Sequence, residues 1–359
     1  MATVTAHSAL DMRHLDFGDF HLATRYAYSS TFVKLHYASG YEDRFGGSFH
    51  VNVLAKSISG TVTSYSGYLT HPTLQLWSIT GLSMSADAVF KASKTLTLTD
   101  DQAIIANAFA GADNIKGATH NDYLKGFGGD DLLKGAAGKD WLDGGVGSHD
   151  AADYAEKAAA VEVKLDGSTW VSVKVNGIGE DTIRNIENIA GGSGSDKLTG
   201  DNVATLLKGN AGNDLLLGAG GADTLTGGWG NDTLSGGAGR DLLTGGGNHD
   251  VFKFSSVGGS GTTATTRDIV TDFAHGTDKI DLSLIDAAAA AGNQAFIFNA
   301  KGSATTAVGQ GHIGWYYEDK PGTANDQTIL KINTDADSTI EMTIQLNGLI
   351  HLNSADFIL

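Results

Sequence analysis

Aspartates recur at nine-residue intervals along two stretches of this 359-residue sequence. In residues 191–253 the register G-G-x-G-x-D-x-U-x, where U is a large apolar residue, restarts every nine residues, and a rougher version begins at residue 108. Short carboxylates held at a fixed spacing beside glycine-rich turns suit a hard, oxygen-binding cation. The aspartates at position six of these nonads are Asp113, Asp122, Asp131, Asp140, Asp196, Asp214, Asp223, Asp232, Asp241 and Asp250.

An apolar residue stands at position eight of every nonad, from Ile115 to Phe252. A period of nine fits neither a helix nor a hairpin, so each nonad is expected to form a tight turn and a very short strand with one inward side chain. Two nonads complete one coil, and alternate aspartates therefore stack on the same flank. The expected stacks are Asp214–Asp232–Asp250 on one flank and Asp223–Asp241 on the other.

Stacked carboxylates about 5 Å apart, the spacing of neighbouring strands, repel one another unless a cation lies between them. Calcium fits this need, because it takes about six to eight oxygen ligands and accepts backbone carbonyls alongside carboxylates. The sequence therefore predicts several Ca²⁺ ions along the flanks of the coil. Thr205 replaces the aspartate in one nonad, so the sites are expected to be unequal.

The nonapeptide resembles the calcium-binding repeat of RTX (repeats-in-toxin) proteins, which implies a parallel β-roll and export from a bacterium. Residues 254–359 resemble the C-terminal module of the serralysin metalloproteases in three places, namely 268–273, 276–283 and 356–359. That resemblance implies an uncleaved export signal at the end of the chain, where Asp356 precedes three apolar residues. The implied partner is the type I secretion apparatus, and the implied location is extracellular.

The expected fold is all-β and has three regions. Residues 1–107 are predicted to form a small antiparallel β sandwich or barrel, followed by short helices that cap the roll. Residues 108–253 form the roll itself, and residues 151–181 interrupt it as a hairpin around Asp166 and Gly167. Residues 254–359 form a β-rich C-terminal cap. An extra residue after position 144 places His149 where an aspartate is expected and displaces Asp150, so the register is predicted to break there.

Composition excludes several classes of function. The formal net charge is −17, which argues against nucleic acid or an anionic membrane as a partner, since both require a basic surface. The sequence contains no cysteine, so disulfides and thiolate metal sites are excluded. Residues 1–18 lack the apolar core of a secretory signal peptide, and no stretch is long and apolar enough for a membrane span.

Familiar catalytic motifs are also absent. The sequence contains neither H-E-x-x-H, the zinc motif of the serralysin peptidase, nor the G-x-S-x-G nucleophile elbow. We therefore expect a non-enzymatic, secreted calcium-binding protein whose N-terminal domain binds a glycan or another cell-surface ligand through Tyr41 and Tyr68. One alternative is a secreted enzyme that acts on polysaccharide or lipid with an unrecognised N-terminal active site. Another is a surface-layer or matrix component held together by calcium bridges.

Overall fold

The computed structural model describes residues 3–6, 25–28, 32–36, 41–52, 57–70, 73–85, 105–287, 295–304, 306–318, 326–335 and 339–359. These residues are almost entirely β, with one helical turn at 105–108 and two short 3-10 turns, η3 (Val257–Gly259) and η4 (Ser354–Asp356). The chain divides into two compact units. Unit 1 comprises residues 1–153, 167–173 and 179–186, and unit 2 comprises residues 154–166, 174–178 and 187–359.

Each unit contains a stack of short parallel strands, as expected for a β-roll. In unit 1 one ladder consists of β7 (Asn114–Lys116), β9 (Leu132–Lys134) and β11 (Ala151–Asp153), and the other of β8 (Tyr123–Lys125), β10 (Trp141–Asp143) and β14 (Ile178–Arg184). Consecutive nonads alternate between the two ladders, so each coil contains two nonads. The predicted parallel roll is confirmed.

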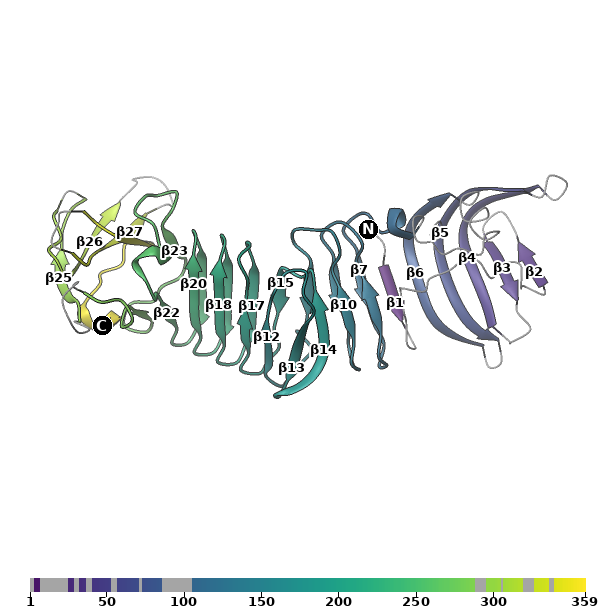
Figure 1. Cartoon of the computed structure of the whole chain (residues 1–359), viewed down its shortest axis with the longest axis horizontal. Helices are drawn as coiled ribbons and strands as arrows, with labels where there is room; N and C mark the ends of the chain where they lie inside the picture. The colour runs from purple at the N-terminus through teal and green to yellow at the C-terminus, as the bar shows by residue number, and fades with distance from the viewer. Residues whose placement is uncertain are drawn as a thin grey trace. The chain divides into compact units, whose positions relative to one another are not determined.

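Unit 2 repeats the same arrangement over more rungs, which run side by side in Figure 1. One ladder contains β15 (Asn188–Ala190), β17 (Leu206–Ala211), β19 (Thr224–Trp229), β21 (Leu242–Gly247) and β23 (Asp268–Val270). The other contains β12 (Val161–Lys164), β16 (Lys197–Thr199), β18 (Leu215–Gly220), β20 (Thr233–Ala238), β22 (Val251–Lys253), β24 (Lys279–Asp281) and β29 (Phe357–Ile358).

The core of each roll is a column of position-eight side chains. Leu216, for example, pairs in register with Leu198 and Leu234, one coil away on either side. All three are fully buried, and the residues that flank each of them along its strand are more exposed. Burying one such side chain contributes about 1.5–3 kcal/mol, and the uniform column explains why the apolar residue recurs so strictly.

The segment predicted as a hairpin insert contributes rungs to both rolls. Its strands β12 and β13 (Val171–Val175) do pair antiparallel, as expected. However, β12 also pairs in parallel with β16 of unit 2, where Val163 lies beside Leu198. In unit 1, β14 pairs with β10 and places Ile183 beside Leu142. The inserted strands join the ladders because each carries an apolar residue that continues the buried column.

The N-terminal strands form an open antiparallel sheet and not the sandwich or barrel that we predicted. Its strands are β2 (Arg25–Tyr28), β3 (Phe32–His36), β4 (Tyr41–Asn52), β5 (Ser57–Thr70), β6 (Thr73–Ser85) and β1 (Thr3–Ala6). In the described residues the sheet does not close, because β1 pairs in parallel with β7, the first rung of the roll. Residues 86–92, where we expect the first of the short capping helices, lie outside the described residues. Ile105 and Phe109, which we expect in the second, are buried.

The C-terminal region adds a sheet to the end of the unit 2 roll. Its strands are β25 (Ile297–Lys301), β26 (His312–Glu318), β27 (Gln327–Asn333) and β28 (Met342–Asn347), and β28 pairs in parallel with β23. The carboxylate of Asp356 is fully buried and accepts hydrogen bonds from the backbone N–H groups of Gly276 and Asn353. No helix among the described residues is long and apolar enough to cross a membrane.

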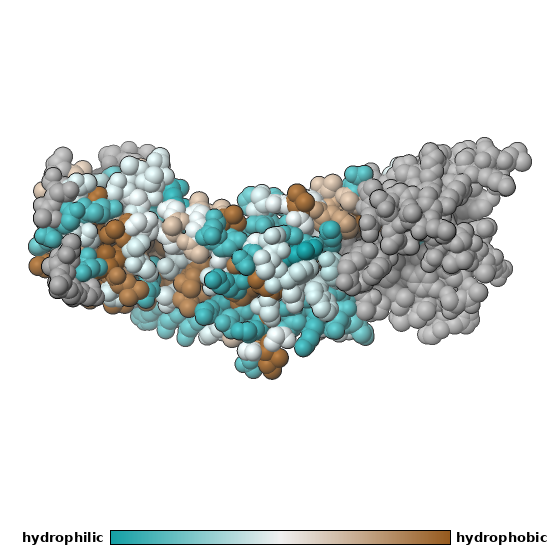
Figure 2. Space-filling model, in the orientation of Figure 1, coloured by the Kyte–Doolittle hydropathy of each residue, from teal (hydrophilic) through white to brown (hydrophobic). Residues whose placement is uncertain are grey.

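Polar and apolar residues are intermixed over the described part of the surface that Figure 2 shows. Among the described residues, Trp229 and Val146 are two of the most exposed large apolar side chains. Both stand at position three of a nonad, outside the positions that form the buried column.

Candidate metal centres

The turn aspartates are linked from coil to coil by a repeated hydrogen bond. In each case the Oδ1 atom accepts the backbone N–H of the aspartate one coil earlier. The distances are 2.8 Å from Asp214 N to Asp232 Oδ1, 2.9 Å from Asp232 N to Asp250 Oδ1 and 2.9 Å from Asp223 N to Asp241 Oδ1. The predicted stacking order on both flanks is confirmed. One carboxylate oxygen of each residue is thus used to join the coils.

The second carboxylate oxygen has a different environment. In the described structure several Oδ2 atoms are buried and accept no hydrogen bond, although a buried polar atom normally has a partner. A carboxylate oxygen in this state carries a desolvation cost that a bound cation would offset. The atoms are those of Asp131, Asp214, Asp223, Asp232, Asp241, Asp250 and Asp268.

The glycine at position one of the nonads from residue 117 onward leaves room beside this oxygen. A Cβ atom on Gly227 would lie 2.2 Å from Asp232 Oδ2 and 2.6 Å from the carbonyl oxygen of Gly245 in the next coil. The corresponding distances at Gly218 are 2.3 Å to Asp223 Oδ2 and 2.4 Å to the Gly236 oxygen. A carboxylate oxygen and a backbone carbonyl oxygen therefore face the same small space. Glycine is required at this position, because any side chain would fill that space.

Burial raises the pKa of these carboxyl groups. Desolvation, followed by repulsion from neighbouring aspartates in the stack, raises the pKa of Asp214 to about 7 and that of Asp250 to about 7. Desolvation also raises the pKa of Asp241 to about 6 and that of Asp268 to about 8. Without a cation, the ionised stack is therefore unfavourable at neutral pH.

The donor set at these positions fits calcium. It combines ionised carboxylates with carbonyl oxygens and contains neither thiolate nor imidazole, and hard cations prefer such ligands. Nowhere in the described part of the chain do three or more His, Asp or Glu side chains gather into one metal-binding group. Most ligands of each ion would therefore be backbone oxygens of two stacked turns.

The ten predicted ligands are all buried in the turns, but they are not equivalent. At two of them the Oδ2 atom accepts a backbone N–H of its own turn. Asp122 Oδ2 accepts from Ala118 N and Asp196 Oδ2 accepts from Gly192 N, each at 2.7 Å. At Thr205, the side-chain hydroxyl donates to Asp223 Oδ1 at 2.7 Å. The aspartates are thus unequal in their hydrogen bonding.

Four stacked aspartates were missed by the sequence analysis. Asp150 Oδ1 accepts from Asp131 N at 2.8 Å, so the predicted break at this point is wrong. The extra residue is absorbed within the turn, and His149 is an exposed neighbour that contacts Asp130. Of the other three, Asp181 accepts from Asp140 N at 3.0 Å, Asp268 from Asp241 N at 2.9 Å, and Asp278 from Asp250 N at 3.0 Å.

Two epimerase subunits and a lipase are among the solved structures with detectable similarity. The AlgE6R2 subunit of the mannuronan C5-epimerase from Azotobacter vinelandii is 26% identical and covers 48% of this chain and 91% of its own, with a TM-score of 0.29. The AlgE6R3 subunit is 22% identical, with 46% and 78% coverage and a TM-score of 0.22. Extracellular lipase LipA from Serratia marcescens is 22% identical, with 70% and 38% coverage and a TM-score of 0.19. TM-scores this low do not support any inference about activity.

Comparison with family models identifies both repeat regions, whereas comparison with curated proteins found no match. Residues 107–142 match the RTX calcium-binding nonapeptide repeat, and the chain binds Ca²⁺. Residues 139–359 match the model described as Peptidase M10 serralysin C terminal, and this match spans more than half of the chain. Together, the two matches mark a protein that is exported by the type I pathway and is extracellular. The chain therefore belongs to the serralysin C-terminal family.

Proposed function

We propose that calcium binding and folding of the two rolls are one event, which takes place after export. The observation that carries this proposal is the row of buried Oδ2 atoms without hydrogen-bond partners. At Asp131, Asp214, Asp223 and Asp232, a carbonyl oxygen of the next coil faces the same space as the Oδ2 atom. The ligands would be the ten predicted aspartates together with Asp150, Asp181 and Asp268, and the remaining oxygens would come from backbone carbonyls.

The coupling follows from the cost of the empty stack. Without calcium, the folded turns hold carboxyl groups in buried positions beside one another, where their ionisation is costly, and the chain as a whole has a formal charge of −17. In the unfolded chain the same carboxylates are hydrated and far apart. Calcium binds only where turns are stacked, so its binding free energy becomes folding free energy. Extracellular calcium-binding modules have dissociation constants of about 10⁻⁴–10⁻³ M, which suits a chain that stays unfolded in the cytosol and folds outside.

Far-ultraviolet circular dichroism of the full chain tests this proposal. In EGTA we expect the β signal of the rolls to be weak, and we expect it to return on addition of millimolar calcium. Magnesium at the same concentration is the control, because its preference for small octahedral sites makes it a poor match to carbonyl-rich turns. A β signal that is the same in EGTA and in calcium would contradict the proposal.

We further propose that the N-terminal sheet is the ligand-binding module and that its ligand is a glycan. This sheet lies outside the nonapeptide repeats, so calcium binding does not account for it. Tyr41 and Tyr68 are offset by one position in the β4–β5 ladder, since Tyr41 pairs with Leu69 and Glu42 with Tyr68. This offset assigns them to opposite faces of the sheet, so each is a candidate contact for a ligand on its own face. Aromatic side chains bring a large apolar surface to a binding site at a low entropy cost.

A glycan array probed with the calcium-loaded full chain tests this second proposal. We expect binding that the double substitution Tyr41→Ser and Tyr68→Ser abolishes without a change in the circular dichroism spectrum. Incubation with polysaccharide and lipid ester substrates serves as the second arm. Turnover of one of these substrates without retained glycan binding would favour the alternative that the protein is a secreted enzyme. Unchanged glycan binding by the double variant would show that the two tyrosines are not part of the binding site.

A further inference from the structure

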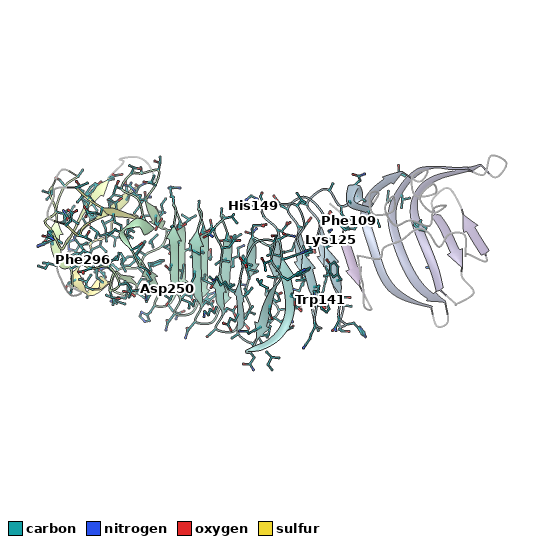
Figure 3. The ribbon with its side chains drawn as sticks, viewed as in Figure 1. Phe109, Lys125, Trp141, His149, Asp250 and Phe296 are labelled. Atoms are coloured by element: carbon teal, nitrogen blue, oxygen red, sulfur yellow. The ribbon has the colours of Figure 1, made fainter. Side chains whose placement is uncertain are left out.

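Three consecutive turns on one flank of the unit 2 roll carry a row of exposed polar side chains. The turns are 209–214, 227–232 and 245–250, and Figure 3 labels Asp250 in the last of them. At position five, next to the aspartate of each turn, stand the exposed residues Asn213, Asn231 and His249. The other ionisable side chains of these turns are the buried aspartates at position six, so this surface carries neither lysine nor arginine.

The backbone of the neighbouring coil fixes the two asparagine side chains. Asn213 Oδ1 accepts the backbone N–H of Asn231 at 2.8 Å, and Asn231 Oδ1 accepts that of His249 at 3.0 Å. These bonds use the carbonyl oxygen of each amide and so orient its NH₂ group. Within the described residues neither NH₂ group has an acceptor. The roll thus holds two amide donors at its surface, one coil apart and in a set orientation.

An exposed indole ring stands in the middle turn, two positions before Asn231. Trp229 is 74% exposed, whereas position three of the other nonads between 191 and 253 holds serine, asparagine, alanine or glycine. Its register neighbours, one coil away on either side, are Ala211 and Gly247. A Cβ atom on Gly247 would lie 3.1 Å from Trp229 Cε3 and 3.3 Å from Cζ3. The ring therefore rests against the backbone of the next coil, and its small neighbours leave it accessible.

A flat apolar ring beside oriented amide donors suits a carbohydrate. A pyranose has a face of C–H groups, which can pack on an aromatic ring, and an edge of hydroxyl groups, which can accept hydrogen bonds. A wholly apolar partner would cover the amide groups and leave them without acceptors, at a desolvation cost. An anionic partner would find no cationic lysine or arginine in these turns. The chemistry of the surface therefore favours a neutral sugar.

We propose that this flank of the unit 2 roll binds a neutral oligosaccharide, with one pyranose ring stacked on Trp229 and its hydroxyl groups accepting hydrogen bonds from the amides of Asn213 and Asn231. Little conformational entropy is lost on binding, because the backbone already holds both amides. The site requires folded turns, so it rests on the calcium-dependent folding proposed above. It does not rest on ligand binding by the N-terminal sheet.

Isothermal titration of the calcium-loaded full chain tests the proposal. Cellohexaose, mannohexaose and maltohexaose are the neutral probes, and an oligogalacturonate of the same length is the anionic comparison. We expect at least one neutral probe to bind, and to bind more tightly than the oligogalacturonate. Binding of none of the three, or tighter binding of the oligogalacturonate, would overturn the proposal. Circular dichroism of the same sample shows whether calcium has folded the roll, which distinguishes this failure from a failure of calcium-dependent folding.

Substitution of the indole locates the site. Trp229→Ala should weaken binding of the neutral probe about tenfold or more, because a central aromatic residue commonly carries much of the binding energy of a site. Trp141→Ala is the matched control. Its indole, labelled in Figure 3, is 44% exposed on β10 of unit 1, and its loss should leave the affinity unchanged. The double variant Tyr41→Ser and Tyr68→Ser should also retain this binding, which separates the site from the N-terminal sheet.

Asn231→Asp tests the amide donor. The carboxylate can still accept the backbone N–H of His249, as Asp130 accepts that of Ser148 at the same position of unit 1 at 3.3 Å, but it has no N–H to donate. We expect binding about twofold to tenfold weaker, with the calcium-induced circular dichroism signal unchanged. Full affinity in Trp229→Ala or in Asn231→Asp, or an equal loss in Trp141→Ala, would overturn the proposal.

Discussion

Asp232 performs two separable tasks in the unit 2 roll, and two substitutions distinguish them. Its Oδ1 atom accepts the backbone N–H of Asp214 at 2.8 Å, and its Oδ2 atom is buried without a hydrogen-bond partner, facing the space beside Gly227. Asp232→Asn retains an acceptor for the Asp214 N–H but loses the charge at the Oδ2 position. Asp232→Ala loses both. We therefore expect the two variants to differ in stability while sharing the same calcium dependence.

The magnitudes follow from linkage. Once a site is nearly saturated, each bound ion adds about 1.4 kcal/mol to the free energy of unfolding for every tenfold rise in free calcium. Removing the Oδ2 ligand should lower this slope by about 1.4 kcal/mol per decade in both variants. Asp232→Ala also leaves the Asp214 N–H buried and unsatisfied, which costs about 1–3 kcal/mol at every calcium concentration. When the free energy of unfolding is plotted against the logarithm of free calcium, the two variants should therefore give parallel lines, and the line of Asp232→Ala should lie lower.

Urea unfolding followed by circular dichroism at about 1, 10 and 100 mM calcium measures these lines. Asp201→Asn is a matched control, because Asp201 lies in a turn of the same unit and its Oδ1 accepts the N–H of Val203 at 3.0 Å, a bond that asparagine retains. The control should keep the slope of the unmodified chain. If Asp232→Asn also keeps that slope, Asp232 is not a ligand. If the alanine and asparagine lines coincide, the hydrogen bond to Asp214 contributes nothing to stability.

Three further predictions concern the same turns. Burial raises the pKa of Asp214 to about 7 from an unfolded value of 3.8, so in EGTA the folded form should gain stability as the pH falls from about 7 towards 4. In calcium the stability should instead fall over this range, because the ligand must be ionised. The β signal in EGTA and the urea midpoint in calcium, each measured against pH, would show the opposite signs. Thr205→Asp should add a carboxylate above Asp223 and raise the number of calcium ions counted by titration. Asp150→Ala should lower the free energy of unfolding by about 1–3 kcal/mol, whereas His149→Ala should lower it by less than about 0.5 kcal/mol. A larger loss in His149→Ala than in Asp150→Ala would support the predicted register break.

The sequence predicted the repeating part of the molecule well, because there each local signal agrees with the fold. Position eight identified the buried column, and the spacing of eighteen residues between flank partners identified the stacks. The N-terminal sheet was predicted less well. Alternation of polar and apolar residues indicates strands but does not indicate how a sheet ends. Only the structure shows that β1 joins β6 to β7, which keeps the sheet open.

The aspartates that were missed do carry a sequence signal, although it is not the glycine register. Each of them precedes a fully buried residue by two positions, as position six precedes position eight in a regular nonad. The pairs are Asp150–Ala152, Asp181–Ile183, Asp268–Val270 and Asp278–Ile280. A triplet of aspartate, any residue and an apolar residue is too short to be specific on its own. It becomes informative only next to the end of a recognised block of nonads.

The ends of the stacks explain why these residues lie where they do. Every stacked aspartate has a buried N–H that needs an acceptor one coil ahead, so a stack cannot stop at the last regular nonad. Asp241 and Asp250 are the last repeat residues of the two flanks, and Asp268 and Asp278 accept their N–H groups from beyond the repeat. Asp268 N then donates to the hydroxyl of Ser260 at 2.7 Å, and this hydroxyl ends the series of carboxylates on that flank. The C-terminal module thus completes the hydrogen bonding of the roll, which gives a physical reason for the two to occur together in one chain.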